Sequence, residues 1–264
     1  MKNIMILAIF YNAKTNPENK KYAREVTDAL DKNKIGYLIN PRQTEFRKIK
    51  TAITVGGDGT VLYTANLLSK YKIPILGINF GHRGYLCQVQ NDMIEDAIMH
   101  IKTNAYEIAE KTRIQAIIEK RNKSIATLDA LNEISVGGIN RTVHLCVSII
   151  TPDMTIDSHI AGDGLIVSTQ TGSTAYNINA GGPMLLTDTF SIVANNAFFD
   201  SKFMLPVTKS IVVSTDTVMK ISDLSHNPSN LPFVITDGID AIKIDKDDTV
   251  TIKKSKNMNR FIVF

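Results

Sequence analysis

The sequence predicts a mixed fold: an N-terminal, Rossmann-like parallel α/β domain followed by a C-terminal β-rich, β-sandwich-like domain. In the first hundred residues, short apolar runs alternate with longer segments whose apolar residues recur at helical spacing. After about Asn104 this spacing stops, and β-branched residues alternate with polar ones between Gly, Pro and Asn. We therefore divide the chain into residues 1–103, 104–231 and a C-terminal run of strands over 232–264.

The first hundred residues alternate strictly between the two kinds of element. Strands are predicted over 4–10, 35–40, 52–55 and 73–79, and helices over 17–33, 61–70 and 93–102. The first helix has Pro17 near its start and apolar side chains at Tyr22, Val26 and Leu30. Such alternation is typical of a parallel sheet covered on both faces, whose ligands bind at the carboxyl ends of the strands.

The second half is predicted to be strand-rich and meander-like. The expected strands cover 114–119, 124–128, 143–151, 164–168, 211–214, 233–236, 249–253 and 260–264. We find no internal repeat, low-complexity tract or flexible linker. We therefore expect the two halves to pack closely and to share a cleft.

Composition narrows the class of protein. Of the 264 residues, 44% are hydrophobic and 21% charged, which is typical of a globular protein with a core. The net charge of +4 includes no long Lys/Arg block, so nucleic acid is not the favoured partner. Cys87 and Cys146 have no metal-like or redox-like spacing, and we expect buried free thiols in a reducing cytoplasm. The apolar stretch 1–10 is too short to span a membrane, so no membrane contact is expected.

A glycine-rich turn between a predicted strand and a predicted helix is the first candidate site. It reads Gly-Gly-Asp-Gly-Thr over residues 56–60. Its glycines allow a phosphate to approach the backbone, and the following helix directs N–H groups and its positive dipole end there. Asp58 would repel phosphate unless it binds a metal or takes a proton, so the turn favours phosphoryl transfer over simple binding. The alternative is an aspartate that caps the helix.

A second candidate is the run over 162–176, which is dense in small and hydroxylated residues. Thr171 and Thr174 offer donors and acceptors for a base or amide edge, and Tyr176 offers a ring for stacking. Asp163 offers an acceptor for an amide or a ribose hydroxyl. The alternative is an ordinary glycine-rich hairpin.

Two shorter elements accompany these runs. Asn132 and Glu133 follow an apolar stretch and are suited to gripping vicinal ribose hydroxyls, although a polar strand end is the plainer interpretation. The glycine loop over 77–86 contains Tyr85, which is either a ligand contact or a core aromatic. For Asp237-Gly238 the alternatives are a position near the site and an ordinary hairpin turn, and the hairpin turn is favoured.

Taken together and in this order, the four elements resemble the NAD kinase family over residues 52–237. The Gly-Gly-Asp-Gly-Thr turn also occurs in diacylglycerol-type lipid kinases and in phosphofructokinases, so the run over 162–176 carries the specificity. The sequence departs from the family pattern at Gln170, where proline is usual, and at Arg83, where leucine is common. Neither departure removes a group that the reaction needs.

The resemblance implies transfer of a terminal phosphoryl group to the 2′-hydroxyl of the adenosine ribose of NAD, giving NADP. It implies that Asp58 is the base. It implies that Gly57, Gly59 and Thr60 shape the phosphate loop and that Asn132 and Glu133 hold the ribose. The residues that it implies for the adenine or its neighbours are Thr171, Thr174, Ala175 and Tyr176, and those for the rest of the dinucleotide are Asp163 and Tyr85. Mg²⁺ or another divalent cation is expected with the donor, because no cluster of carboxylates forms a metal site.

The resemblance also implies a homodimer or homotetramer, and C-terminal strands that return to the first domain. ATP or polyphosphate as donor, NAD or NADH as acceptor, and regulation by NADP(H) stay open. Two rival functions remain: a lipid kinase, which would have no base to stack on the 171–176 segment, and a dinucleotide sensor, which would not need Asp58.

Overall fold

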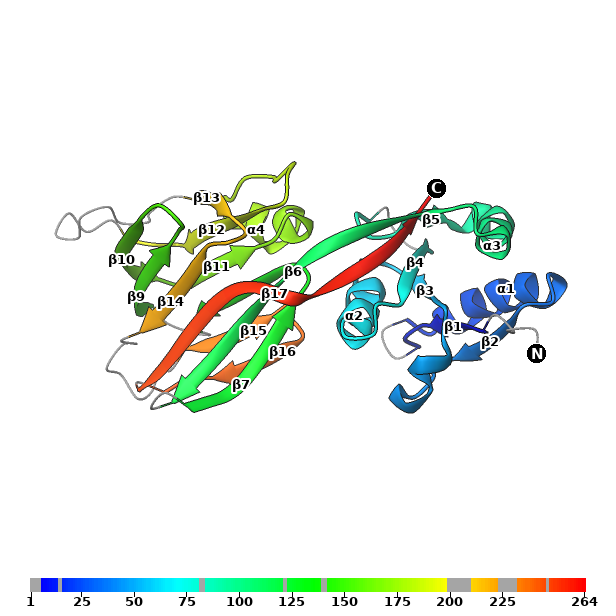
Figure 1. Cartoon of the computed structure of the whole chain (residues 1–264), viewed down its shortest axis with the longest axis horizontal. Coiled ribbons are helices and arrows are strands. Elements are labelled where there is room, and N and C mark those ends of the chain that lie inside the picture. Colours follow the sequence, from blue (N-terminus) through cyan, green and yellow to red (C-terminus); the bar gives the residue numbers. More distant parts are fainter. Residues whose placement is uncertain are drawn as a thin grey trace. The chain divides into compact units, whose positions relative to one another are not determined.

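The computed structural model describes residues 6–13, 16–80, 84–120, 123–138, 142–198, 210–222, 232–245 and 247–264. The chain forms two compact units (Figure 1). The first unit comprises Met1–Lys111 together with Asn257–Phe264, and the second comprises Thr112–Lys256. Within the described residues, no helix is long and apolar enough to cross a membrane.

The first unit is built on a parallel sheet with the strand order β4-β3-β1-β2. Its strands are β1 (Ile6–Phe10), β2 (Gly36–Ile39), β3 (Thr51–Gly56) and β4 (Pro74–Asn79). The short β5 (Val89–Gln90) pairs with the end of β4, and β17 (Asp248–Val263) pairs with the start of β4 through Arg260 and Phe261. Because all these strands are parallel, the carboxyl ends of β1 to β4 lie at one edge.

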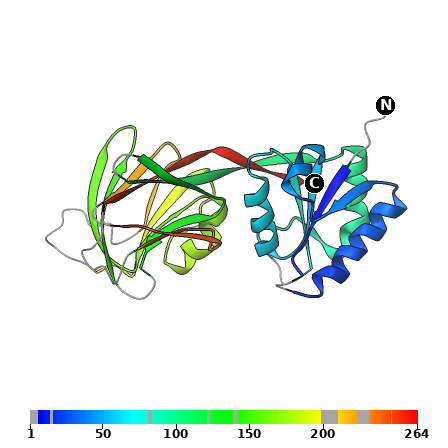
Figure 2. The ribbon, with the colours of Figure 1, turned by 90° about the horizontal axis from the view of Figure 1, so that it is seen from below.

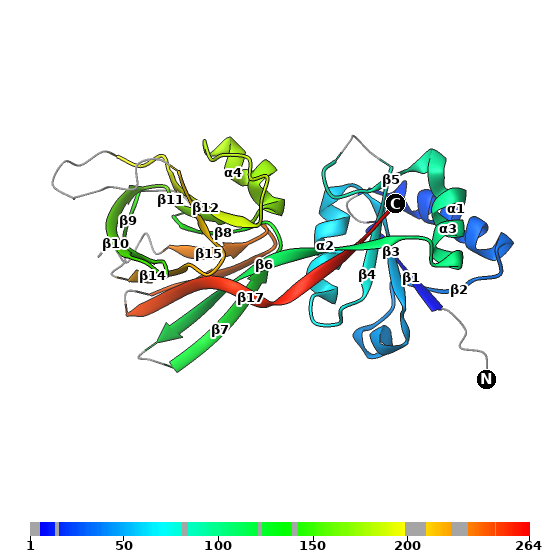
Figure 3. The same ribbon diagram turned by 45° about the horizontal axis from the view of Figure 1, so that its top comes forward.

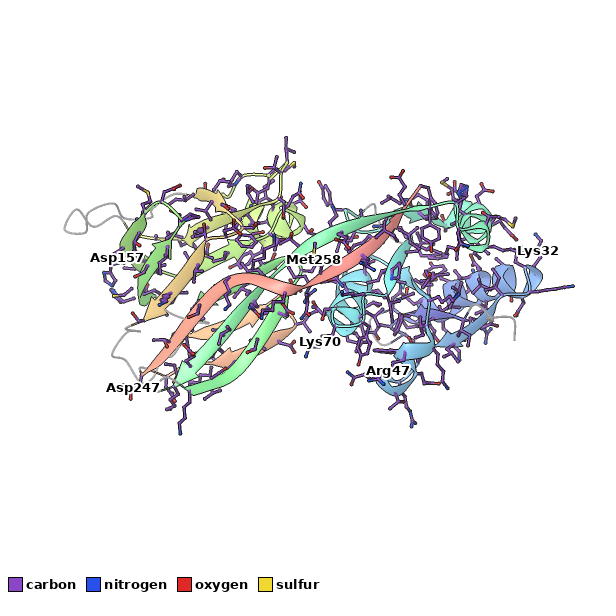
Figure 4. All side chains as sticks on the ribbon, viewed as in Figure 1. Lys32, Arg47, Lys70, Asp157, Asp247 and Met258 are labelled. Atoms are coloured by element: carbon purple, nitrogen blue, oxygen red, sulfur yellow. The ribbon has the colours of Figure 1, made fainter. Side chains whose placement is uncertain are left out.

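Helices cover both faces of this sheet, as Figure 2 shows with α1 in blue and α2 in cyan on opposite sides. The helical elements are α1 (Asn19–Lys32), η1 (Gln43–Lys48), α2 (Asp58–Leu68), η2 (Asn91–Met93) and α3 (Ile94–Thr103). Alternate strand residues such as Leu7, Ile9 and Ile53 pack with the apolar faces of α1 and α3. The exposed pair of Lys32, at the end of α1 (Figure 4), with Glu95 adds at most ~1 kcal/mol.

The second unit contains two layers of largely antiparallel strands. One layer has the order β13-β12-β11-β8-β15-β16, with bounds β8 (Glu133–Gly137), β11 (Gly164–Ser168), β12 (Thr189–Asn195), β13 (Ile211–Ser214), β15 (Phe233–Thr236) and β16 (Asp240–Lys243). The other layer is formed by β6 (Glu107–Lys120), β7 (Lys123–Ala130), β9 (Val143–Ile150), β10 (Thr155–Gly162), β14 (Val218–Ser222) and β17.

A core of alternating apolar residues joins these two layers. Ile134 and Val136 of β8 and Leu165 and Val167 of β11 face it from one layer, and Leu145 of β9 faces it from the other. The helical turns η3 (Thr171–Thr174) and α4 (Tyr176–Asn179) follow β11, and α4 lies beside it (Figure 3). The predicted fold class, a parallel α/β domain with a β-rich second domain, is confirmed.

The structure corrects the strands predicted near the C-terminus. Segments 249–253 and 260–264 belong to one strand, β17, of 16 residues. The polar residues between these segments suggested a break, but Ser255 and Asn259 are buried. The Asn259 side chain donates to the Ala65 carbonyl at 2.8 Å. The sequence also gave no signal for β10, whose centre is the polar stretch Asp157, Ser158 and His159.

Candidate active site

The glycine turn joins the end of β3 to the start of α2, as predicted. Gly56 has a φ of 143°, and a Cβ there would lie 2.7 Å from the Thr60 hydroxyl oxygen, so only glycine fits. At Gly57 and Gly59, by contrast, a Cβ would meet no atom within 4 Å. Packing within the protein therefore does not require glycine at these two positions. Beside the first amides of a helix, such open backbone is suited to a phosphate.

Asp58 is the first residue of α2, but its carboxylate does not cap the helix. One carboxylate oxygen accepts from the Tyr85 amide at 2.7 Å and the other from the Leu86 amide at 3.0 Å. Gly84 packs so closely on this carboxylate that a Cβ there would collide with it. The loop after β4 thus fixes the orientation of Asp58, and each oxygen keeps a second lone pair with which it can accept another proton.

Cys87 and Tyr85 both lie near the Asp58 carboxylate, and their environments differ. Burial, followed by the charge of Asp58, raises the pKa of the Cys87 thiol to about 12, and the thiol donates to the Gly56 carbonyl at 3.6 Å. Cys87 is therefore a protonated packing residue at neutral pH and no nucleophile. The Tyr85 side chain is 75% exposed, so the alternative of a core aromatic is wrong. Arg83, one of the two departures noted above, lies outside the described residues.

Asn132 lies between β7 and β8, Glu133 is the first residue of β8, and the two are only 9% and 8% exposed. Asp237 holds their backbone. Its carboxylate accepts from the amides of Leu131 at 2.8 Å, Asn132 at 2.7 Å and Glu133 at 3.2 Å, and its own amide donates to the Glu133 carbonyl at 3.0 Å. Asp237 does lie in a turn, between β15 and β16, with a φ of 52°. The hairpin interpretation was thus correct, but it missed this contact.

A buried cation lies beside this group of carboxylates. Arg113 of β6 is 1% exposed, and its Nε lies 3.9 Å from a carboxylate oxygen of Asp129. Burial lowers the pKa of Arg113, while the charges of Asp129 and Asp237 oppose that shift. Its positive charge therefore offsets part of the negative charge that these two residues bring into the interior.

The side chains of Asn132 and Glu133 each have one buried oxygen, Oδ1 and Oε2, without a hydrogen-bond partner among the described residues. Burial, followed by the charge of Asp237, raises the pKa of Glu133 to about 7. Near neutral pH the Glu133 carboxyl is thus partly protonated and both donates and accepts. A buried polar atom without a partner is costly, which makes this pair suited to a ligand with hydroxyl groups.

The 162–176 run lies against the same pair. Gly172, in η3, packs directly on the Asn132 carbonyl, which leaves no room for a Cβ. Thr169 donates from its amide to that carbonyl at 2.9 Å and from its hydroxyl to the Leu131 carbonyl at 2.6 Å. The turn that carries Thr171, Thr174 and Ala175 is therefore held beside Asn132. The structure thus brings together the 162–176 run and the Asn132–Glu133 pair, which the sequence analysis treated as separate elements.

Residues at both ends of this run line a small pocket of about 110 Å³ together with β8 and β12. Asp163 and Tyr176 both contribute to it. Asn195 and Asn196 fix these two side chains, because Asn195 donates to the Tyr176 hydroxyl at 3.0 Å and Asn196 to the Asp163 carboxylate at 2.6 Å. No sequence pattern singled out these asparagines, since β12 was not predicted.

The predicted residues thus form two groups. Asp58, its glycine turn and Tyr85 lie in the first unit, and the pair at 132–133, Asp163 and the 171–176 segment lie in the second. Among the described residues, no group of three or more His, Cys, Asp or Glu side chains could hold a metal ion. A resident metal does not fit these residues, whereas a cation that arrives bound to a phosphate ligand needs no such group.

Two family models together match most of the chain. The ATP-NAD kinase N-terminal domain matches residues 11–106, and the ATP-NAD kinase C-terminal domain matches residues 131–264. The chain belongs to the NAD kinase family. It is an enzyme of that family, as the resemblance of its motifs predicted.

Individual members of the family match over most of their length. The NAD kinase of Caldanaerobacter subterraneus subsp. tengcongensis is 30% identical over 92% of this chain and 83% of its own. The NAD kinase of Clostridium kluyveri is 34% identical over 84% of this chain and 76% of its own.

Two solved structures have the same fold as this chain. The NAD kinase from Archaeoglobus fulgidus, crystallised in complex with ATP, is 25% identical with a TM-score of 0.75, over 97% of this chain and 93% of that one. Yeast NADH kinase, complexed with NADH, has a TM-score of 0.81 at 17% identity, over 99% and 84% of the two chains, and supports the fold alone.

Proposed function

We propose that this NAD kinase transfers the terminal phosphoryl group of ATP or another donor to the 2′-hydroxyl of the adenosine ribose of NAD. One observation carries the proposal: the buried, partnerless oxygens of Asn132 and Glu133 beside the η3 turn. Ribose hydroxyls both donate and accept, as the amide of Asn132 and the partly protonated carboxyl of Glu133 do. The Thr171, Thr174, Ala175 and Tyr176 segment then meets the adenine, and Asp163 and Tyr85 the rest of the dinucleotide.

Asp58 takes the proton of the reacting hydroxyl in this proposal. The freed oxygen attacks the terminal phosphorus, whose bond to the bridging oxygen breaks, and the leaving diphosphate keeps that electron pair. The amides of residues 85 and 86 hold the Asp58 carboxylate in place for this step. Gly57, Gly59 and Thr60 receive the donor phosphates at the N-terminus of α2.

Mg²⁺ or another divalent cation enters with the donor in this proposal. When bound with the donor, it would neutralise phosphate charge. The chain's own contribution is the glycine turn and the carboxylate of Asp58, and the residues described hold no cage for the ion alone.

The test is to incubate the purified protein with NAD, ATP and Mg²⁺ and to locate the new phosphate by nuclear magnetic resonance. The expected product carries it on the 2′-oxygen of the adenosine ribose, and a chelator stops its formation. Phosphate on another position would contradict the regiochemistry. Turnover of a lipid alcohol instead of NAD would favour the lipid kinase, and NAD binding without product under varied donors and metals would favour the sensor.

The assembly and location of the enzyme are part of the same proposal. We infer a homodimer or homotetramer, supported by the exposed apolar side chains Leu186 (83%) and Phe198 (64%) in the second unit. We infer a cytoplasmic location, supported by Cys87 and Cys146, neither of which forms a disulfide. Sedimentation should give a mass at least twice that of the 29.2 kDa chain, and a monomer at working concentration would contradict the assembly.

A further inference from the structure

We propose that Gln88 is a positioning residue for the proposed base: acting through Leu86, it holds the Asp58 carboxylate in the orientation that proton transfer needs. Gln88 immediately precedes β5, at the end of the segment that follows β4 and passes over the Asp58 carboxylate. The inference rests on the proposed role of Asp58, and it adds to that role the side chain that keeps the carboxylate in place.

The side-chain amide of Gln88 joins two main-chain groups. Its Oε1 accepts from the Gly77 amide at 2.9 Å, and its Nε2 donates to the Leu86 carbonyl at 2.5 Å. Gln88 is an exposed residue, yet both polar ends of its amide bond the backbone. The long side chain therefore gives up rotamer freedom that a solvated glutamine keeps, and it links the segment around Leu86 to β4.

Gly77 lies at a gap in the pairing of β4. On the side of β4 away from β3, β17 pairs with it as far as Ile75, and β5 pairs with it from Ile78 onward. Between these two strands the Gly77 carbonyl accepts from the Gln88 amide at 3.0 Å, and the Gly77 amide donates to the Gln88 side chain. Gln88 thus completes this part of the sheet and is anchored to it at two points.

Leu86 connects this anchor with Asp58. Gln88 binds the Leu86 carbonyl, while the Leu86 amide donates to the Asp58 carboxylate at 3.0 Å. A residue held at both its amide and its carbonyl has little freedom to rotate about φ and ψ. Packing leaves equally little space, because a Cβ on Gly77 would lie 3.0 Å from the Cys87 Cα and 3.2 Å from the Leu86 carbonyl oxygen. Gln88 therefore sets the direction of the N–H group that orients the carboxylate.

The orientation of a general base affects the rate more than the binding of substrate. The base must lie within hydrogen-bond distance of the hydroxyl proton that it takes. A displacement of about 1 Å can lower a rate by about 100-fold. The residues proposed to hold the ribose and the adenine lie in the second unit, whereas Gln88 lies in the first. Loss of the Gln88 amide should therefore lower kcat and leave the KM for NAD unchanged.

The experiment uses the full-length protein and substitutions at Gln88. Gln88→Ala removes the side chain, and Gln88→Met keeps its length without the polar ends. Gln43→Ala changes an exposed glutamine in η1 of the same unit and is the matched control. Gln88→Ala is also combined with Asp58→Asn. Steady-state kinetics at saturating donor give kcat and the KM for NAD, and the stoichiometry of NAD binding by calorimetry corrects kcat for the folded fraction.

Gln88→Ala and Gln88→Met are each expected to lower kcat by about 10- to 100-fold, with a KM for NAD within about 2-fold of the parent. Gln43→Ala should match the parent. In the Asp58→Asn background, Gln88→Ala should change the residual kcat by less than about 2-fold, because the carboxylate that Gln88 positions is already absent. A purely structural role would lower kcat to the same extent in both backgrounds.

Three results would overturn the positioning role: a parent-like kcat in Gln88→Ala or Gln88→Met, a rise in the KM for NAD without a fall in kcat, or an equal loss of kcat in both backgrounds. A parent-like kcat in Asp58→Asn alone would instead contradict the proposed function, because Asp58 would then not be the base. The Asp58→Asn variant without the second substitution thus separates the two failures.

Discussion

The carboxylate of Asp58 accepts two backbone hydrogen bonds, and this limits how it works as a base. The bonds fix its orientation, so little reorganisation is needed when a hydroxyl group arrives. They also tie the loop at 84–86 to the start of α2. A substitution at Asp58 therefore affects both proton transfer and the position of Tyr85.

Asp58→Asn is expected to lower turnover by at least ~100-fold, because an amide cannot take the hydroxyl proton. The affinity for NAD should stay within a few-fold of the parent, since the groups in the second unit are intact. Steady-state kinetics and calorimetry with NAD check this pair of results. Turnover close to that of the parent would remove Asp58 from the role of base.

Asp237 is a positioning residue for Asn132 and Glu133. Asp237→Asn keeps a side chain that tolerates a positive φ but loses the charge that serves three buried amides. We expect a loss of ~1–3 kcal/mol in the free energy of unfolding and a higher KM for NAD. Asp240→Asn, at an exposed site in the same hairpin, is the control. Denaturant titration and the KM are measured, and equal behaviour of the two variants would contradict the role.

Asp237 also has a contact that the sequence alone does not predict. An Asp-Gly dipeptide fits a hairpin turn on local grounds, and the turn is there. Its carboxylate, however, contacts amides more than a hundred positions earlier in the chain, and no local pattern reports such a contact. The roles of Asn195 and Asn196 were missed for the same reason.

At the scale of elements, the sequence predicted best where strands and helices have regular apolar spacing. The bounds of β11, β13 and β15 agree with the prediction, because each strand is a short β-branched run between turn residues. β10 and the centre of β17 were missed, since polar residues there are held by neighbouring strands and by contacts such as that of Asn259. The division of the chain at residues 104 and 232 stays a prediction.

The turn before α2 and the loop after β4 give opposite expectations for glycine substitutions. Gly59→Ala meets no atom and adds a better helix former, so the free energy of unfolding should stay equal or rise by up to ~1 kcal/mol. Its KM for the donor should rise about tenfold, equivalent to ~1.4 kcal/mol, because the methyl group blocks the phosphate. Gly84→Ala should instead lower turnover, because its Cβ displaces the Asp58 carboxylate.

Thermal melting and donor-dependent kinetics of both variants separate these effects. A Gly59→Ala variant that binds the donor as tightly as the parent would remove the glycine turn from phosphate binding. An unchanged turnover in Gly84→Ala would show that the Asp58 carboxylate does not need its observed orientation.

At the scale of the whole molecule, one buried carboxyl makes stability depend on pH. The pKa of Glu133 is about 7 in the folded protein, compared with 4.5 for the free group. Between these values the unfolded chain releases a proton that the folded protein keeps. Stability is therefore lost as the pH rises from about 4.5 to about 7, by roughly 3 kcal/mol in total.

Glu133→Gln should remove this dependence. Its free energy of unfolding relative to the parent should be higher at pH 8 than at pH 5, by up to roughly 3 kcal/mol. Urea titrations at the two pH values provide the measurement. The same difference at both pH values would mean that the burial of Glu133 does not perturb its ionisation.

The route of β17 has a consequence for biosynthesis. Residues 257–264 complete the first unit by pairing with β4, but the ribosome makes them only after the whole of 112–256. At usual synthesis rates this interval is on the order of ten seconds. During this time the first unit exposes the edge of β4, a template for pairing with other chains. The domain that begins first is thus completed last, and nascent chains depend on protection of that edge until β17 arrives.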